Sequence, residues 1–300
     1  MEDKLINNKE DNIEDNDNQN QNEEKKLIKQ EQKKTEEIQV EEISGNSKKK
    51  IIIFVVLAVI LILIAIALIL VFTLKDKGDI EILEPLIMNS TSGNHTHTII
   101  FMPGLTNQPE DFNKTFTSKI QFTKKNDTTI IILRSPYTYV TLFKSKNYSW
   151  FDVYKKPLTD FSDINLDELK TKAARVLEKV INNEVNILNG DYSKIIIGGH
   201  SQGACISLYQ AYISNKKYGG LFAFSGLLPP ADISDDKNDL NAWIGYGDKD
   251  DMISPSFMNK TLSTIAHFKG VEIHIYENLT HYVKTEEAKD AAKFLDRIIK

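Results

Sequence analysis

The sequence predicts an α/β fold in which a mostly parallel β-sheet is covered by helices on both faces. Residues 96–300 contain short runs of continuous apolar residues, which are typical of strands buried on both faces. These runs alternate with segments whose apolar residues recur at helical spacing, the order that a parallel sheet requires. We expect this domain to be preceded by a disordered tail and one transmembrane helix.

Six strands and four helices make up the predicted domain. The first two apolar runs end at Pro103-Gly104 and at Arg134-Ser135-Pro136, which are turn sequences. Asn165 or Asp163 is available as a cap for the first helix. The predicted strands cover residues 98–102, 129–133, 194–198, 221–224, 242–246 and 271–276, and the predicted helices cover residues 167–188, 204–215, 256–268 and 286–299.

Residues 1–50 form a polar tail. They hold eight Asn, ten Lys and fourteen Asp or Glu, with few large apolar side chains. Such a segment cannot bury enough apolar surface to offset its chain entropy, so we expect it to be disordered.

The tail is followed by an apolar run over residues 51–72 that has no charge, Gly or Pro. A run of this length matches the thickness of a bilayer core. A cleavable signal peptide is excluded because the run is too long and begins too far from the N-terminus. A buried core helix would need a polar face. The sequence therefore predicts a transmembrane signal anchor at residues 51–74, a juxtamembrane stalk at 75–95 and one domain at 96–300.

Two features predict the direction of insertion. Five lysines lie in the twenty residues before the span and two in the twenty after it, which favours a cytosolic N-terminus. Every Asn-x-Ser/Thr sequon lies after the span, whereas the eight Asn of the tail form none. We therefore expect a single-pass membrane protein with a lumenal or extracellular, glycosylated domain. The sequons begin at Asn89, Asn94, Asn113, Asn126, Asn147, Asn259 and Asn278.

Charge and cysteine content exclude several classes of function. The formal net charge is −5 and no basic stripe is present, so nucleic acid is not an expected partner. Cys205 is the only cysteine, which excludes an intrachain disulfide and a cysteine-based metal site. His95 and His97 supply two candidate metal ligands without a third, so we expect no metal. The sequence does not indicate an oligomeric state.

The candidate nucleophile is Ser201 in the string Gly199-His200-Ser201-Gln202-Gly203. The string follows a predicted buried strand and precedes a predicted helix, which is the context of a nucleophile elbow. Glycines at both ends let the strand and helix approach closely. The N-terminus of the helix then directs free N–H groups at a developing oxyanion.

A serine nucleophile needs a base, and the base needs an orienting carboxylate. When the three residues follow each other in the chain order Ser, acid, His, the His must come after the last strand. His281 is the one His in a loop directly after the last predicted strand. The loop after the preceding strand offers Asp248, Asp250 and Asp251. By position we select Asp250, with Asp248 as the alternative.

Six blocks of sequence resemble the acyl-protein thioesterase/carboxylesterase family, also called the phospholipase/carboxylesterase family, in their order and approximate spacing. The resemblance covers nearly all of residues 96–300 and implies an α/β-hydrolase fold. The blocks are residues 99–105, 149–152, 198–204, 220–229, 247–250 and 276–281.

The resemblance implies a catalytic triad of Ser201, Asp250 and His281, with the backbone N–H groups of Leu105 and Gln202 as oxyanion donors. It also implies that the aromatic segment containing Trp150 and Phe151 walls an acyl groove, and the alternative is that these aromatic residues pack a long loop onto the core. No cofactor is implied. Family members usually carry His-Gly-x-Gly in the first loop, where this chain has Pro-Gly-Leu-Thr at residues 103–106, and His-Gly before the acid, where it has Tyr-Gly at 246–247. Backbone donors survive such side-chain changes.

Two functions follow as hypotheses. The first is a serine esterase or thioesterase that forms an acyl-enzyme on Ser201 and acts on an acyl lipid or an acylated protein. The family's best-known reaction, removal of palmitate from cytosolic protein cysteines, does not suit a lumenal domain, for which lysophospholipids or other acyl esters are better substrates. The second is a catalytically silent hydrolase fold that acts in binding or adhesion at the membrane.

Overall fold

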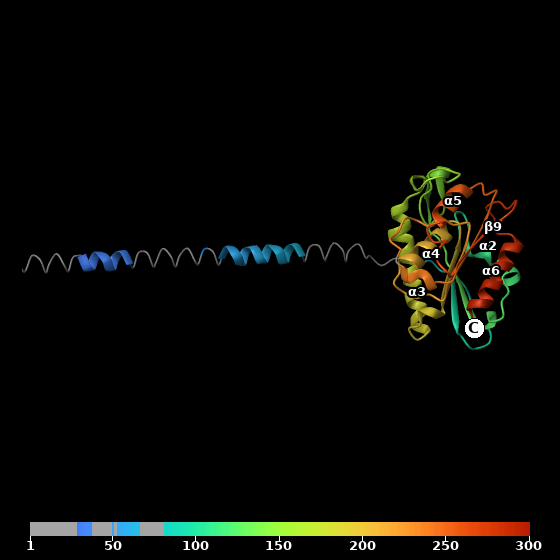
Figure 1. The fold of residues 1–300 in the computed structure, drawn as a ribbon, viewed down its shortest axis with the longest axis horizontal. Helices are drawn as coiled ribbons and strands as arrows, with labels where there is room; N and C mark the ends of the chain where they lie inside the picture. Colours follow the sequence, from blue (N-terminus) through green and yellow to red (C-terminus); the bar gives the residue numbers. More distant parts are fainter. Residues whose placement is uncertain (1–28, 38–49, 51–52, 67–80, 234) are drawn as a thin grey trace, which may run out of the picture. The chain divides into compact units, whose positions relative to one another are not determined.

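The computed structural model describes residues 29–37, 50, 53–66, 81–233 and 235–300 (Figure 1). The chain divides into two units, Met1–Gly78 and Asp79–Lys300. Most of the predicted disordered tail lies outside the described residues, and residues 29–37 within it are helical. Residues 51–52 and 67–74 of the predicted membrane span and residues 75–80 of the predicted stalk also lie outside them.

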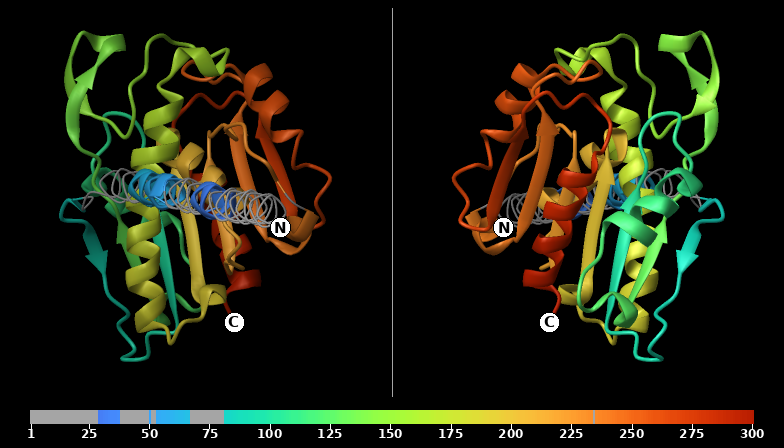
Figure 2. Two further views of the ribbon diagram at one scale, coloured as in Figure 1. Left: turned by 90° about the vertical axis from the view of Figure 1, so that its left-hand side faces the viewer. Right: turned by 90° about the vertical axis from the view of Figure 1, so that its right-hand side faces the viewer.

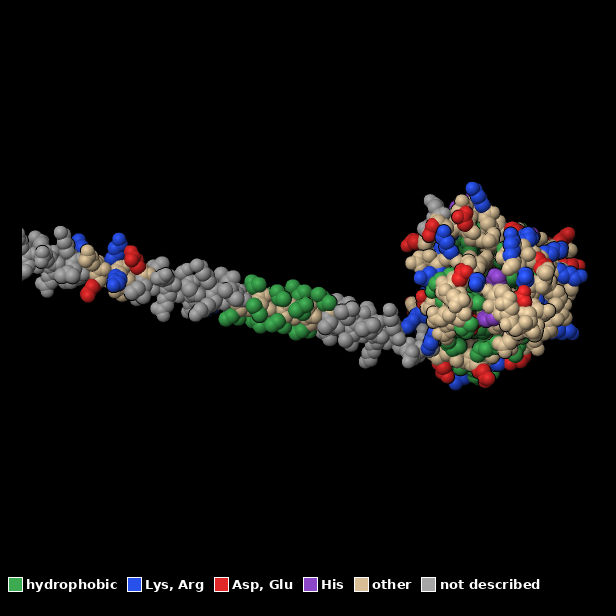
Figure 3. Space-filling model, turned by 90° about the horizontal axis from the view of Figure 1, so that it is seen from below, with side chains coloured by type: hydrophobic (Ala, Val, Ile, Leu, Met, Phe, Trp, Pro, Cys, Tyr) green, Lys and Arg blue, Asp and Glu red, His purple; other side chains and the backbone are tan. Residues whose placement is uncertain are grey.

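Residues 53–66 form a helix with exposed apolar side chains. Phe54, for example, is 76% exposed and Leu61 is 67% exposed. Figure 3 shows this segment as a continuous stretch of hydrophobic side chains. Among the described residues, no helix combines the length and the apolar character needed to cross a membrane.

The second unit is built on a seven-stranded sheet. Its strand order is β1-β3-β2-β6-β7-β8-β9, and every neighbouring pair is parallel except β1 with β3. The mostly parallel sheet predicted from the sequence is therefore confirmed. The strands are β1 (Leu86–Met88), β2 (His97–Met102), β3 (Thr128–Ile132), β6 (Ile195–His200), β7 (Gly220–Phe224), β8 (Ala242–Gly247) and β9 (Val271–Tyr276).

Both faces of this sheet are apolar. Its central strands are continuous apolar runs, and successive side chains of a strand point to opposite faces. Ile100 and Met102 of β2 join a core with helices α3 (Ala174–Ile187), α4 (Gln202–Ile213) and α5 (Pro255–Leu262). Ile99 and Phe101 join a second core with α2 (Pro109–Lys114) and α6 (Thr285–Ile298). Figure 1 shows α3 and α6 on opposite sides of the sheet. This arrangement explains why the strands are continuous apolar runs.

A separate two-stranded hairpin, β4 (Tyr137–Val140) and β5 (Ser145–Tyr148), follows β3. It projects from the body of the domain in both views of Figure 2. Its strand β4 has three exposed residues out of four, which explains why no buried strand is predicted there.

The carboxyl ends of the parallel strands meet at one edge of the sheet, which is where ligands bind in open α/β sheets. Residues 103–107 follow β2 at this edge, Ser201 follows β6, residues 248–253 follow β8 and residues 277–284 follow β9. All of the predicted catalytic residues therefore lie in loops at the same edge.

Most predicted elements agree with the observed ones to within about two residues. Two helices differ more. The start of the predicted helix 167–188 is a π-helical segment at Glu168–Ala173, so α3 begins at Ala174. Helix α5 ends at Leu262, six residues before the predicted end. Strand β1 was not predicted and lies within the range predicted as a stalk, where it pairs antiparallel with β3 at the sheet edge. Three residues are too few for an alternation pattern to be visible in the sequence.

Candidate active site

Ser201 occupies a strained turn between β6 and α4. Its φ of 55° and ψ of −117° are rare for a residue with a side chain. The turn is held by two backbone hydrogen bonds, from the Ser201 N–H to the Phe224 carbonyl at 2.9 Å and from the Cys205 N–H to the Ser201 carbonyl at 3.0 Å. This is the backbone geometry of a nucleophile elbow.

The glycine that ends the elbow motif is required by close packing. A Cβ atom added to Gly203 would lie 1.9 Å from the carbonyl oxygen of Met102 on β2. A side chain there would push α4 away from the sheet, so Gly203 fixes the distance between the start of the helix and the neighbouring strand.

His281 and Asp250 form a buried pair. The distance from His281 Nδ1 to Asp250 Oδ2 is 2.7 Å, and the two side chains are 7% and 0% exposed. The other carboxylate oxygen of Asp250 accepts the backbone N–H groups of Met252 at 2.9 Å and Ile253 at 2.8 Å. Nδ1 of His281 must therefore carry the proton, which leaves Nε2 free to act as a base.

The environment keeps Asp250 ionised. Burial alone raises the pKa of this carboxyl, but the hydrogen bond and charge of His281, together with the Ile253 and Met252 N–H donors, outweigh burial and lower its pKa below the ordinary value. An ionised carboxylate can stabilise an imidazolium on His281.

The alternative acid, Asp248, is placed differently. Its backbone N–H donates to the Tyr276 carbonyl at 3.1 Å, and its Oδ1 atom is buried without a hydrogen-bond partner in the part of the chain that the structure describes. Asp251 is exposed. Of the three carboxylates in this loop, Asp250 is the one hydrogen-bonded to His281.

Ser201 and His281 line one cavity of about 220 Å³. No direct hydrogen bond joins the Ser201 hydroxyl to His281 among the contacts of the described residues. Two lysines, Lys155 and Lys156, also line the cavity, and Lys155 is paired with Asp163 at 3.2 Å. The remaining wall is largely apolar and includes Leu105, Phe143, Phe151, Val153, Leu158, Ile164, Met252 and Ile253. Such a cavity can hold a hydrocarbon chain next to the serine.

Both candidate oxyanion residues, Leu105 and Gln202, line the same cavity. Within the described ranges, neither backbone N–H has an acceptor among the protein's own carbonyl groups and side chains. Gln202 is the first residue of α4, so its N–H is one of the unpaired donors at the start of a helix. Both donors are therefore available to a ligand.

Phe151 lines the cavity, whereas Trp150 is buried behind it. The indole N–H of Trp150 donates to the carbonyl of Pro103 at 2.9 Å, in the loop that carries Leu105. Trp150 thus contacts the loop that carries Leu105 and is not part of the cavity wall.

The Gln202 side chain has a role that the sequence did not reveal. Its Oε1 accepts the backbone N–H of Trp150 at 3.0 Å, and its Nε2 donates to the Phe151 carbonyl at 2.8 Å and to the Ser149 hydroxyl at 3.0 Å. These bonds attach the Ser149–Phe151 segment to the elbow. The sequence holds no local signal for these bonds, because the burial of Gln202, which requires such partners, is visible only in the fold.

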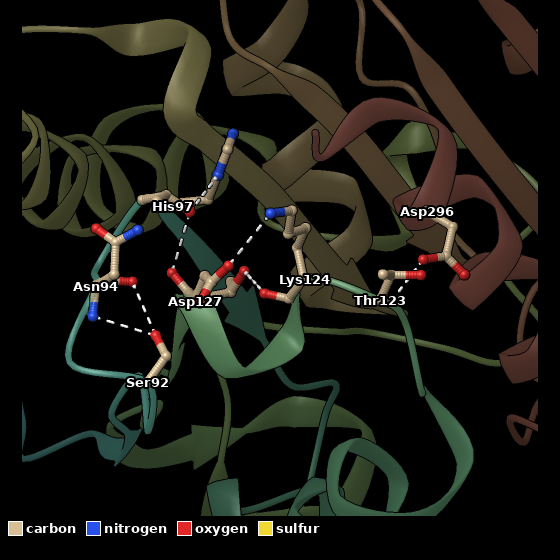
Figure 4. Close-up of polar contacts among 9 residues, drawn as sticks. Ser92, Asn94, His97, Thr123, Lys124, Asp127 and Asp296 are labelled. Atoms are coloured by element: carbon tan, nitrogen blue, oxygen red, sulfur yellow. Dashed lines mark hydrogen bonds and ion pairs between the residues drawn. The ribbon is translucent and has the colours of Figure 1, made fainter.

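His95 and His97 lie at the opposite end of β2 from the cavity. His97 Nδ1 is 2.9 Å from the Thr96 hydroxyl, and Figure 4 shows His97 beside the ion pair of Lys124 and Asp127, whose charged atoms are 3.5 Å apart. Burial, and then the charge of Lys194, lower the pKa of His97. Among the described residues, no three His, Cys, Asp or Glu side chains form a group that could hold a metal ion.

Comparisons with known proteins identify a family. A family model described as Phospholipase/Carboxylesterase matches residues 84–299. The chain is 27% identical over 225 residues to acyl-protein thioesterase 1 of Yarrowia lipolytica, covering 72% of this chain and 98% of the relative. It is 30% identical over 168 residues to acyl-protein thioesterase 1 of Candida albicans, and this match covers 50% of this chain and 69% of the relative.

Solved structures show the same fold. SOBER1 of Arabidopsis thaliana superposes with a TM-score of 0.62 at 20% identity, covering 68% of this chain and 99% of that chain. Acyl-protein thioesterase 2 of Zea mays superposes with a TM-score of 0.55 at 19% identity, covering 72% of this chain and 99% of that chain. The fold is therefore that of the α/β-hydrolases.

Proposed function

Because the chain belongs to the phospholipase/carboxylesterase family, we propose that it is a serine hydrolase that cleaves acyl esters or thioesters. The observation that carries this proposal is the buried His281–Asp250 pair, with its 2.7 Å hydrogen bond, on the wall of the cavity that also contains the strained Ser201. The same cavity presents free backbone donors and an apolar wall.

In the proposed mechanism Ser201 Oγ attacks the substrate carbonyl while His281 Nε2 takes its proton. The ionised Asp250 stabilises the imidazolium that forms on His281. The N–H groups of Leu105 and Gln202 stabilise the oxyanion of the tetrahedral intermediate. The leaving alcohol or thiol takes the proton from His281, and water then releases the fatty acid from the acyl-enzyme by the reverse sequence of proton transfers.

We place the enzyme at a membrane surface, anchored through the apolar run at residues 51–72. The lysine distribution and the sequons support a cytosolic N-terminus and a lumenal or extracellular domain. Six of the seven sequon asparagines are exposed, and Asn147 is half-buried. On that side of the membrane, lysophospholipids and other acyl esters are the substrates we favour over cytosolic palmitoylated proteins.

Labelling of the full-length chain with a fluorophosphonate tests the chemistry. Wild type should be labelled and the Ser201→Ala variant should not, and a panel of acyl esters and thioesters should be hydrolysed only by wild type. Absence of Ser201-dependent labelling would reject the enzyme and leave the alternative, a hydrolase fold used in binding or adhesion.

Expression in a eukaryotic cell tests the topology. We expect a mobility shift on glycosidase treatment and protection of the domain from protease added to the cytosolic side. If all sequons stay unmodified while the domain is digested from the cytosolic side, the proposed orientation is inverted.

A further inference from the structure

A second imidazole lies beside the candidate base. His200 is the last residue of β6, directly before Ser201, and is 4% exposed. Its ring centroid is 5.0 Å from that of His281, and its Nε2 is 2.9 Å from the backbone carbonyl oxygen of His281. The proposed mechanism assigns His200 no role.

The hydrogen bond determines the protonation of His200. A carbonyl oxygen only accepts, so Nε2 must carry the proton. Burial, and then the charge of His281, lower the pKa of His200 to about 3. The ring therefore stays neutral when the neighbouring His281 gains a proton, and its Nε2–H remains a donor throughout the reaction.

His200 also contacts the loop that carries Leu105. A Cβ atom at Gly104 would lie 2.9 Å from His200 Nδ1, so the loop before Leu105 packs directly on the ring. The Phe112 ring lies on the imidazole with a centroid distance of 5.6 Å. The Nδ1 atom is buried and has no hydrogen-bond partner in the ranges that the structure describes. Among the described residues, the His281 carbonyl is thus the only polar anchor of this ring.

His281 itself is held at two points. Asp250 holds the imidazole at Nδ1, and His200 holds the main chain of the same residue. Because His200 is adjacent to Ser201, its hydrogen bond connects the nucleophile elbow to the loop of the base. We propose, on the basis of the function proposed above, that His200 is a positioning residue that sets the placement of His281 relative to Ser201.

Two amide variants of the full-length chain isolate this hydrogen bond. The amide nitrogen of Gln reaches about as far as Nε2 of His, whereas the shorter Asn reaches only about as far as Nδ1. We expect His200→Asn to lower kcat about tenfold with little change in KM, since one hydrogen bond that aligns the base is lost. The kcat of His200→Gln should stay within about threefold of the wild-type kcat. His200→Phe, which keeps a ring without a donor, should behave like His200→Asn.

A spectroscopic signal separates positioning from general structural damage. The low-field proton resonance of the His281 Nδ1–H, which reports its bond to Asp250, should persist in His200→Gln and broaden or shift in His200→Asn and His200→Phe. Thermal unfolding first checks that the Asn and Gln variants are folded. Equal kcat values for these two folded variants overturn the inference. If wild type shows no Ser201-dependent labelling, the proposed function fails instead, and the resonance in the three variants still decides whether His200 positions His281.

Discussion

Asp250 holds His281 through only one of its carboxylate oxygens, because the other is saturated by the N–H groups of Met252 and Ile253. The carboxylate cannot rotate without breaking bonds to its own loop. The orientation of the imidazole is therefore determined by the backbone after β8, and the pair is suited to select the tautomer of His281 that leaves Nε2 unprotonated.

Asp250→Asn should consequently lower kcat by about 10³- to 10⁴-fold, because an amide nitrogen facing Nδ1 favours the wrong tautomer of His281. Asp248→Asn is the matched control in the same loop and should retain most activity, since Asp248 does not contact His281 in the described contacts. Steady-state kinetics on a soluble acyl ester measure both. A larger loss of kcat in Asp248→Asn than in Asp250→Asn would show that Asp248, and not Asp250, is the acid of the triad.

The strain at Ser201 predicts a difference between two inactive variants. Glycine adopts a positive φ without a Cβ penalty, whereas alanine keeps the strain. Ser201→Gly should therefore be more stable than Ser201→Ala by about 1 kcal/mol, after the greater chain entropy of glycine is subtracted. Thermal unfolding of the two variants should differ by about 2–4 °C in Tm. An equal or lower Tm for the glycine variant contradicts strain at this position.

Glu287 predicts how stability depends on pH. It is 1% exposed on α6, and burial raises its pKa to about 8 from an ordinary value of 4.5, with the charge of Asp250 adding to the effect. The folded chain thus keeps a proton that the unfolded chain releases near pH 4.5. The free energy of unfolding should fall as pH rises from about 4.5 to 8.

Glu287→Gln should remove most of that fall and be more stable than wild type at pH 8 by at least about 2 kcal/mol. Urea unfolding at pH 5 and pH 8 measures the change, with the exposed neighbour Glu286→Gln as control. The same slope in wild type and Glu287→Gln would show that Glu287 is not the group responsible.

Gln202→Ala should lower the free energy of unfolding by about 2–4 kcal/mol. The substitution leaves the buried Trp150 N–H and Phe151 carbonyl without their partner. Gln121→Ala removes an exposed amide that also bonds to backbone carbonyls, and should change stability by less than about 0.5 kcal/mol. Chemical denaturation of both variants tests this, and similar losses for the two would argue against the buried role of Gln202.

The sequence predicted those parts of the site that depend on local patterns. Ser201 is identified by its motif between a strand and a helix, and His281 by its place after the last strand, because parallel strands deliver both loops to one edge. The choice of Asp250 over Asp248 rested on position in the sequence and on the family resemblance, and the bond of Asp250 to His281 is visible only once the fold is known.

Other features depend on contacts between distant segments and have no local signal. The Gln202 side chain bonds to residues about fifty positions away, and His200 bonds to a residue 81 positions away. The family resemblance implied that Trp150 walls the groove, and the alternative was that it packs the loop onto the core. Which of the two applies depends on the fold, in which the Trp150 indole N–H donates to the Pro103 carbonyl. Hairpin β4–β5 escaped prediction because exposed strands lack the apolar run on which the other strands were recognised.

The bonds from Gln202 to the Ser149–Phe151 segment, and from Trp150 to Pro103, have a practical consequence for engineering. The wall of the cavity, the turn that bears Ser201 and the loop that bears Leu105 share one connected set of hydrogen bonds. A loop taken from a relative to change acyl-chain preference will therefore disturb turnover as well, unless the residues equivalent to Ser149, Trp150 and Phe151 are transplanted with their partners.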